Sequence, residues 1–463
     1  MYSSKGIDNL HKSIKGEVYL REDNDYENSI SKAIWNGRIP DRQPAALVVA
    51  KCQKDVITSI NFARKNSFSI SCKTGGHSHS VCFLQENCIL LDLSRLNELK
   101  VDPKRRVAYV QPGVTSAQLD SSLSGFSLAF STGHDGDVTM AGFLLGGGLG
   151  INCSAWGGMS TFNIEAVDVI MPSGEHLHAN YIEHPEILWA AQGGASGIFF
   201  CVVGLYLKCY ERPNVITTNN YIFGFSSLPK LVEKLNNISN KIAPSLQVMI
   251  TMPTTPTSLA DACRPEDHGR LTMVSAIAFA SYKANEQNLH ALLDESLSIM
   301  PEVLSIDRGL ITDFDCFYKN SKLMHMCSRW ISDNILTNDI TPAAKIILKH
   351  LPLSPSPSSQ PLIVLQKTRH LPEAAYSAVG DFYLSTYAQW DEKENDDDNT
   401  NWLYQFYADL QKYASGFYIN ELDREHRKKN IPLCYSSGSW TKLKSLKTKY
   451  DPDNVFLGFN LED

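Results

Sequence analysis

A histidine that follows two glycines is the part of this chain with the clearest capacity for chemistry. Lys73-Thr74-Gly75-Gly76-His77-Ser78 lies between two apolar segments, residues 68–72 and 88–93. Adjacent glycines let backbone N–H groups converge on a phosphate, and the imidazole of His77 can act as a nucleophile or a ligand. The pattern favours a dinucleotide cofactor, which His77 could also hold covalently. A plain tight turn with a half-exposed histidine also fits these residues.

A second glycine cluster follows about seventy residues later, at Gly146-Gly147-Gly148-Leu149-Gly150. It does not match the nicotinamide pattern G-x-G-x-x-G, because the third glycine position holds Ile151 or Cys153, depending on the starting glycine. Apolar residues are interleaved with these glycines, which favours close backbone approach to a ligand over a plain linker.

The elements that position these turns alternate between strand and helix patterns. Strands are predicted at 46–50, 68–72, 88–93, 106–113, 164–171 and 198–209, and helices at 54–65, 116–123 and 187–191. After Pro213 strands are predicted at 221–225, 247–251, 271–282 and 416–420, and helices at 228–242, 286–300, 401–415 and 442–449. The acidic segment 391–399 lacks the Gly and final Glu of a calcium loop, so it predicts a solvated loop and no metal site.

Length and composition set the outer limits. A length of 463 residues, of which 43% are hydrophobic and 20% are charged, indicates two globular domains. A net charge of −7 and a pI near 6.0 argue against a nucleic-acid partner. No apolar run is long enough to cross a membrane, and no export signal is evident. The eleven cysteines contain no C-x-x-C pair, so we expect reduced thiols and a cytoplasmic protein.

Four blocks of sequence together resemble the berberine-bridge-enzyme-like flavoproteins, a branch of the vanillyl-alcohol oxidase/para-cresol methylhydroxylase superfamily. They are Lys73 to Ser78, Val138 to Gly150, His184 to Gly194, and Lys447 to Phe456. They occur in the family's order, and the resemblance covers roughly residues 40–212 and 383–463.

The resemblance implies FAD, bound covalently through an 8α bond to His77. The residues that it assigns to the cofactor are Lys73, Thr74, Gly75, Gly76, His77, Ser78, Thr139, Gly142, Gly146, Gly148, Val202 and Asn460. Many members add a second bond from a cysteine, but the matching segment here is Asp135-Gly136-Asp137-Val138. Cys153 is not at the family's position, so a single histidyl link is predicted.

For catalysis, Tyr418-Ile419-Asn420 matches the family's Tyr-x-Asn block, whose next residue is often tyrosine and here is Glu421. Tyr418 is predicted as the base or as a phenol that stabilises a substrate oxyanion, with Asn420 orienting it; a packed strand tyrosine is the alternative. Strand alternation predicts that Glu421 faces solvent, although it could replace the tyrosine as base. Tyr435 begins a segment that partly matches another family block. His79 and His134 are further imidazoles near the cofactor loops.

These observations predict an α+β, two-domain FAD-binding fold: an FAD domain from residues 1–212 that 425–463 complete, and an antiparallel-sheet substrate domain backed by helices at 213–424. The resemblance implies an oxidase that removes a hydride from a C–H next to O or N of a small molecule, with O₂ reoxidising the flavin to give H₂O₂. A dehydrogenase with another electron acceptor, or a flavin- or ligand-binding protein without turnover, are the alternatives.

Overall fold

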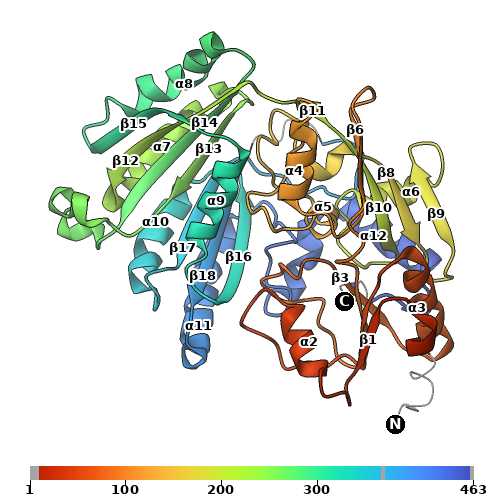
Figure 1. Cartoon of the computed structure of the whole chain (residues 1–463). Helices are drawn as coiled ribbons and strands as arrows, with labels where there is room; N and C mark the ends of the chain where they lie inside the picture. Colours follow the sequence, from red (N-terminus) through yellow and green to blue (C-terminus); the bar gives the residue numbers. More distant parts are fainter. Residues whose placement is uncertain (1–9, 367–370, 459–463) are drawn as a thin grey trace.

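The computed structural model describes residues 10–366 and 371–458. Two halves are evident in Figure 1. One contains three small sheets from the first half of the chain, and the other is built on a single large sheet.

The first sheet holds the segment that leads into the Gly-Gly-His turn. Its strand order is β1 (Glu17–Leu20), β2 (Ala46–Val49), β4 (Ile89–Asp92) and β3 (Ile70–Lys73). Strands β2, β4 and β3 are parallel, and β1 is antiparallel to β2. The continuous apolar sequences of β2 and β4 are fully buried, as expected for parallel strands covered on both faces. Val56, Ile60 and Ala63 of α3 (Gln53–Lys65) pack in the same core.

The second sheet is antiparallel, with the order β5 (Leu99–Asp102), β6 (Val107–Val110), β10 (Cys201–Lys208), β8 (Ile164–Ile170) and β9 (His176–Asn180). Short strands β7 (Leu128–Ala129) and β11 (Tyr210–Glu211) pair separately. The helices associated with this half are α2 (Tyr26–Lys32), α4 (Ser116–Ser124), α5 (Met140–Leu145), α6 (Pro185–Ala191) and α12 (Ser437–Tyr450). The glycine cluster 146–150 therefore follows the short helix α5.

The large sheet has seven strands, and all neighbouring pairs are antiparallel. Their order is β15 (Val303–Ile311), β12 (Val215–Gly224), β14 (Leu271–Ala280), β13 (Leu246–Thr251), β17 (Gln360–Leu365), β18 (Phe382–Trp390) and β16 (Arg329–Thr337). Its helices are α7 (Leu228–Ile238), α8 (Lys283–Leu297), α10 (Thr341–His350) and α11 (Asp396–Leu410), with α9 (Phe314–Met324) nearer the other half (Figure 1).

The strands alternate between two environments. Val248 and Ile250 of β13 belong to the core under the helices, whereas Met249 and Thr251 line a cavity. This period-two pattern is what lets one sheet support both a hydrophobic core and a binding surface.

Two predicted elements are wrong. Residues 417–420 form an irregular segment and a turn, because Gly416 alone pairs with the sheet, at Leu336. In the acidic segment 391–399, Asp396 begins α11 and its carboxylate pairs with Arg329 at 2.5 Å. Strands β15, β16 and β17 and helices α9 and α10 were not predicted from the sequence.

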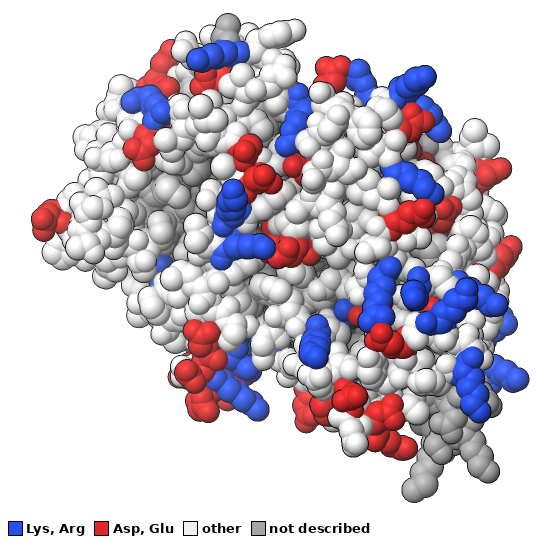
Figure 2. All heavy atoms as spheres, in the orientation of Figure 1, with Lys and Arg blue, Asp and Glu red and all other residues white. Residues whose placement is uncertain are grey.

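Strand β11 ends at Glu211 and β12 begins at Val215 in a different sheet. This supports the domain division that we propose after residue 212. Figure 2 shows basic and acidic side chains interspersed over this face of the molecule. Among the described residues, no helix is both long and apolar enough to cross a membrane.

Candidate active site

A cavity of about 870 Å³ lies between the two halves of the molecule. One wall comes from the turns of the smaller sheets, and it includes His77, Thr139 and Val202. The other comes from the exposed face of the large sheet, where Met249, Ser275 and Tyr387 contribute. The volume is in the range of natural cofactor and small-molecule sites.

The Gly-Gly-His turn borders this cavity and is fixed from behind by the N-terminal region. Gly76 has a φ of +75°, and a Cβ on it would lie 2.3 Å from the carbonyl oxygen of Ala33. Trp35 donates its backbone N–H to the Gly76 carbonyl at 3.3 Å. Glycine is required here by both the left-handed backbone and the close approach of another segment.

His77 is half-buried in the cavity wall, and its ring stacks on Trp35 with the centroids 5.1 Å apart. Burial lowers the pKa of the His77 imidazole, although Asp135 and Asp137 act in the opposite direction. The ring is therefore neutral at neutral pH, which is the form that carries a nucleophilic nitrogen.

Hydroxyl groups and one buried ion pair hold the rest of this turn. Thr74 and Thr139 share a hydrogen bond of 2.6 Å, and Gly75 donates its N–H to Thr139 at 3.1 Å. Lys73 pairs with Asp92 at 2.8 Å, with both side chains less than 10% exposed. Lys73, Thr74, Gly76, Ser78, Thr139 and Gly142 line the cavity, whereas Gly75 supports Thr139 from behind.

Gly146 and Gly148 do not line the cavity but support residues that do. A Cβ on Gly146 would lie 1.9 Å from Oδ1 of Asn420, and the N–H of Gly148 donates to the hydroxyl oxygen of Tyr418 at 3.1 Å. The glycine cluster thus gives the Tyr418–Asn420 segment its place against α5.

Tyr418 and Asn420 both line the cavity. The phenol oxygen of Tyr418 accepts from Gly148 N–H and from the Asn420 amide at 3.0 Å. Asn420 also donates to the Phe143 carbonyl at 3.0 Å. Burial, with the nearby charge of Glu421, raises the pKa of the Tyr418 phenol, so it is a neutral hydroxyl at physiological pH.

The expectation that Glu421 faces solvent is wrong. Because residues 417–420 are not a strand, alternation does not apply, and the turn brings Glu421 into the cavity wall. Its Oε2 accepts hydrogen bonds from Tyr383 at 2.5 Å, Ser385 at 2.7 Å and Tyr387 at 2.9 Å. Burial raises the pKa of the Glu421 carboxyl, although these three bonds favour its charged form.

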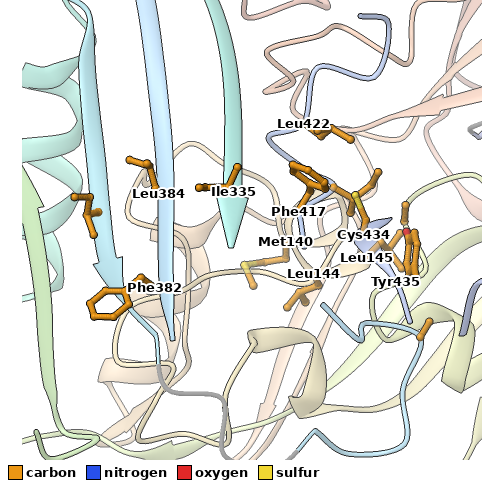
Figure 3. Packing of buried hydrophobic residues seen from close by; sticks show 14 of the residues in the cluster. Met140, Leu144, Leu145, Ile335, Phe382, Leu384, Phe417, Leu422, Cys434 and Tyr435 are labelled. Atoms are coloured by element: carbon orange, nitrogen blue, oxygen red, sulfur yellow. The ribbon is translucent and has the colours of Figure 1, made fainter. Parts of the chain in front are cut away.

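Tyr435 is not at the cavity. It lies in the hydrophobic core with Leu145 and Cys434 and stacks on Trp440 at 5.7 Å (Figure 3). Its predicted catalytic role is therefore not supported by its position. Asn460 lies outside the described residues.

Three further imidazoles line the cavity. His79 bonds to Ser332 at 2.9 Å, His134 accepts from the Gln247 amide at 2.9 Å, and His325 lies 3.4 Å from Asp135. Burial lowers the pKa of both His79 and His134 to about 4.

Asp135, at the position of the family's second attachment cysteine, lines the cavity, whereas Cys153 does not. Five described glycines do line it: Gly76, Gly133, Gly142, Gly197 and Gly458. Their backbone allows close approach of a ligand. Val202, Gly458 and His77 line this cavity together with residues of the large sheet.

Sequence reasoning missed several residues of this site. Tyr383, Ser385 and Tyr387 share one face of β18, and their i, i+2, i+4 spacing was a usable signal. Trp35 carried no such signal, because it meets His77 only through the fold.

The comparisons with known proteins identify an FAD-binding domain in this chain. Residues 44–180 match the family model described as FAD binding domain. The chain is 25% identical to the FAD-linked oxidoreductase janO of Penicillium janthinellum, with 92% of each chain covered. It is 27% identical to (R)-6-hydroxynicotine oxidase of Paenarthrobacter nicotinovorans over 64% of this chain and 66% of that protein.

The fold has close counterparts among solved structures. The TM-score is 0.82 to 6-hydroxy-D-nicotine oxidase of Arthrobacter nicotinovorans at 20% identity, covering 97% of this chain and 98% of the other. It is 0.81 to berberine bridge enzyme of Eschscholzia californica at 17% identity, covering 98% and 97%. The α+β, two-domain FAD-binding fold is thereby confirmed. The chain is an FAD-linked oxidoreductase with the berberine-bridge-enzyme-like fold that its sequence motifs resemble.

Proposed function

We propose that this protein is an oxidase that holds FAD covalently through His77 alone and oxidises a small molecule at a C–H next to oxygen or nitrogen. Bound FAD would supply the two-electron acceptor, and O₂ would be the final electron acceptor, giving H₂O₂. The observation that carries the proposal is one cavity that joins His77 to Tyr418 and Asn420. The same cavity is walled on its far side by the large sheet, where a substrate can lie.

The surroundings of His77 support covalent attachment. Its imidazole is kept neutral by burial, and the stack on Trp35 restricts the ring to one plane. Asp135, at the position of the family's attachment cysteine, is a carboxylate and cannot form the thioether. A single link is the consequence.

The attachment is tested by denaturing the purified protein in acid and following flavin absorbance in the pellet. Wild type should retain flavin, His77→Ala should release it, and His79→Ala should retain it because this matched histidine is not the attachment point. Release from wild type would remove the covalent part of the proposal and leave a non-covalent flavoprotein.

The chain's own residues divide the remaining work. FAD, when bound, supplies the two-electron acceptor. Tyr418 presents a neutral O–H to the cavity because its oxygen already accepts from Gly148 and Asn420. It can therefore donate to a substrate oxygen or nitrogen, and Asn420 fixes the direction of that donation.

The electron acceptor is tested with a substrate found by anaerobic bleaching of the flavin. An oxidase re-oxidises rapidly in air and gives one H₂O₂ per substrate. A dehydrogenase turns over with a dye and is nearly silent in air. If no substrate class reduces the bound flavin, the protein is a binding protein without turnover.

We also propose a cytoplasmic location, in which thiols stay reduced. All eleven cysteines are free, and four of them line the cavity. Fractionation of cells that express the native chain tests this directly.

A further inference from the structure

We propose that Glu421 is the group that accepts the substrate's proton, and that the substrate is an alcohol carried on a largely apolar skeleton. This inference rests on the proposed function and assigns its base and its substrate class. It places the catalytic base at a position where the sequence resemblance has tyrosine.

The geometry of Glu421 is that of a built acceptor. Three hydroxyl groups of β18 converge on Oε2, and the backbone carbonyl of Glu421 accepts from Ser332 at 3.1 Å. Among the described residues, no hydrogen bond reaches Oε1, and the side chain lines the cavity. One oxygen is thus anchored, and the other is available to a ligand.

Tyr418 complements this acceptor with a donor. The two residues are joined by a turn in which the Glu421 N–H donates to the Tyr418 carbonyl at 3.2 Å. The ring of Tyr418 also meets that of Tyr383 edge-on, at 5.8 Å between centroids. A hydroxyl group has one proton to give and lone pairs to receive one, which matches the Glu421 carboxylate and the Tyr418 O–H.

The other groups in the cavity are less suited to take a proton. The carboxylates that line its described part are Asp135 and Glu421, and Asp135 already faces His325. His79 and His134 have pKa values near 4, and one nitrogen of each is engaged by Ser332 or Gln247. A base matched to neutral pH is better supplied by a carboxyl with a raised pKa.

The wall opposite the cofactor loops indicates the rest of the substrate. Three adjacent strands contribute the apolar residues Met249 from β13, Met273 and Ile277 from β14, and Leu362 and Val364 from β17. At one rim, Leu310 and Ile311 line the cavity and are 45% and 90% exposed. The same sheet also lines the cavity with the polar residues Asn220, Thr251, Ser275 and Gln360. The continuous apolar patch on the three strands matches an apolar skeleton, and the polar residues beside it can bind a few polar substituents.

The proposed reaction converts an alcohol to a carbonyl compound by loss of one proton and one hydride. The O–H bond of R₂CH–OH breaks and its proton goes to Oε1 of Glu421, while the C–H bond breaks and its hydrogen leaves with two electrons. Bound FAD would supply the two-electron oxidant for this hydride, and a C=O bond forms in the substrate. The carboxylic acid of Glu421 then returns its proton to solvent.

Burial raises the pKa of Glu421, and the hydroxyl groups of Tyr383, Ser385 and Tyr387 oppose that shift. The titratable and charged groups around Glu421 are Tyr383 and Tyr387 from β18, Tyr418 and Arg424 from its own segment, His79 against Tyr387, and the Asp333–Arg427 ion pair beyond Ser332. Burial lowers the pKa of His79 to about 4, whereas burial raises the pKa of Asp333 to about 7. An acid limb is therefore assigned to Glu421 only if it disappears in Glu421→Gln, which leaves Asp333 in place.

The test compares wild type with Glu421→Gln, in which the amide oxygen can still accept the three hydroxyl bonds. The holoenzyme is mixed without oxygen with 1-phenylethanol, 1-phenylethylamine or glucose, and flavin bleaching is recorded from pH 5 to 9. We expect the alcohol to reduce wild-type flavin, with a rate that falls at low pH. In the variant this rate should fall by about 100-fold or more and lose its acid limb.

Two controls separate proton transfer from structure. Glu425→Gln, four residues further along and paired at the surface with Arg42, should match wild type. Dithionite should reduce all variants equally if their FAD sites are intact. Infrared titration of the holoenzyme should show a carboxyl signal that titrates above the ordinary glutamate range and is missing in Glu421→Gln, beside that of Asp333, whose pKa burial raises to about 7.

The outcomes are distinct. A variant that keeps the wild-type rate and acid limb, or unchanged infrared titration, overturns the role of Glu421. Reduction by the amine or by glucose but not by the alcohol overturns the substrate class, while the oxidase proposal stands. Failure of all three compounds and of a wider panel to reduce the flavin defeats the proposed function and this inference together.

Discussion

Replacing Gly146 by alanine tests whether this glycine serves the Tyr418–Asn420 segment rather than the cofactor directly. The backbone of Gly146, with φ −97°, is one that alanine adopts without strain. The new methyl group would lie 1.9 Å from Oδ1 and 2.4 Å from Cγ of Asn420. Asn420 must move, because both distances are far shorter than van der Waals contact.

The magnitude follows from the hydrogen bonds that this movement breaks. Asn420 donates to the Phe143 carbonyl at 3.0 Å, to the Tyr418 oxygen at 3.0 Å and, more weakly, to the Gly142 carbonyl at 3.4 Å. Two to three bonds at about 1 kcal/mol each give a loss of about 2–3 kcal/mol. Removing glycine from the unfolded chain returns about 0.5 kcal/mol. We therefore expect the free energy of unfolding to fall by about 2 kcal/mol.

A double-mutant cycle measures this coupling. Gly146→Ala, Asn420→Ala and the double variant are unfolded in guanidinium while tryptophan and flavin fluorescence are followed together, so that one cooperative transition can be verified. In the double variant the obstructing amide is absent, and the coupling energy should reach about 2 kcal/mol. Flavin content should stay at the wild-type level in Gly146→Ala, because this residue does not line the cavity.

Gly438→Ala is the matched control. It lies in the first turn of α12, where a Cβ would meet nothing within 4 Å, and alanine there should be neutral or slightly stabilising. If Gly146→Ala and Asn420→Ala were additive to within about 0.5 kcal/mol, the two residues would not be coupled and the reasoning would be refuted.

Three further predictions concern buried ionisable side chains. Asp92→Asn leaves the Lys73 ammonium buried without its partner and should lower the free energy of unfolding by about 3–5 kcal/mol; a loss below about 1 kcal/mol in denaturant titration would contradict this. His134 has a native pKa of about 4 against about 6.5 unfolded, so the unfolded state binds more protons between these values. The stability that it contributes is present above pH 6.5 and falls by about 2 kcal/mol from pH 7 to pH 5, and His134→Gln should flatten the measured pH profile by that amount. Asp451→Asn weakens the ion pair with Lys447 at 2.6 Å and one of the two hydrogen bonds that Asp451 accepts from backbone N–H groups of residues 455–456. Hydrogen exchange at the Ile70 amide should therefore quicken at least tenfold. Unchanged exchange would show that residues 455–456 stay in place without Asp451.

The sequence predicted the secondary structure of those segments whose own residues are enough to determine it. The strands at 70–73 and 89–92 and the helix at 53–65 are such cases, because apolar runs and 3.6-residue periodicity report burial directly. The glycine of the Gly-Gly-His turn was also recognised, since its backbone conformation restricts the residue type.

What the sequence did not reveal depends on partners far along the chain. Glu421 has three hydroxyl partners on β18, some 34 to 38 positions earlier, and only the fold brings them together. The prediction of a strand at 416–420 was wrong because the apolar residues Phe417 and Ile419, although buried, belong to an irregular segment that does not pair with a neighbouring strand. Tyr435 matched a motif but is packed in the core, so the residue type alone did not fix its role.

The short strand β3, which leads into the His77 turn, has one further implication, for the order of events during synthesis. Its free side is completed by the end of the chain: Ile70 donates to Val455 at 2.6 Å and accepts from Leu457 at 2.7 Å. Ribosomes need roughly 20–80 seconds to make the intervening 385 residues at 5–20 residues per second. Throughout that time β3 lacks the backbone hydrogen bonds to Val455 and Leu457, although the N-terminal region already contacts Gly76. We therefore expect cofactor loading to follow the synthesis of residues 455–457, and a ribosome-bound chain that stops before residue 455 should carry no flavin.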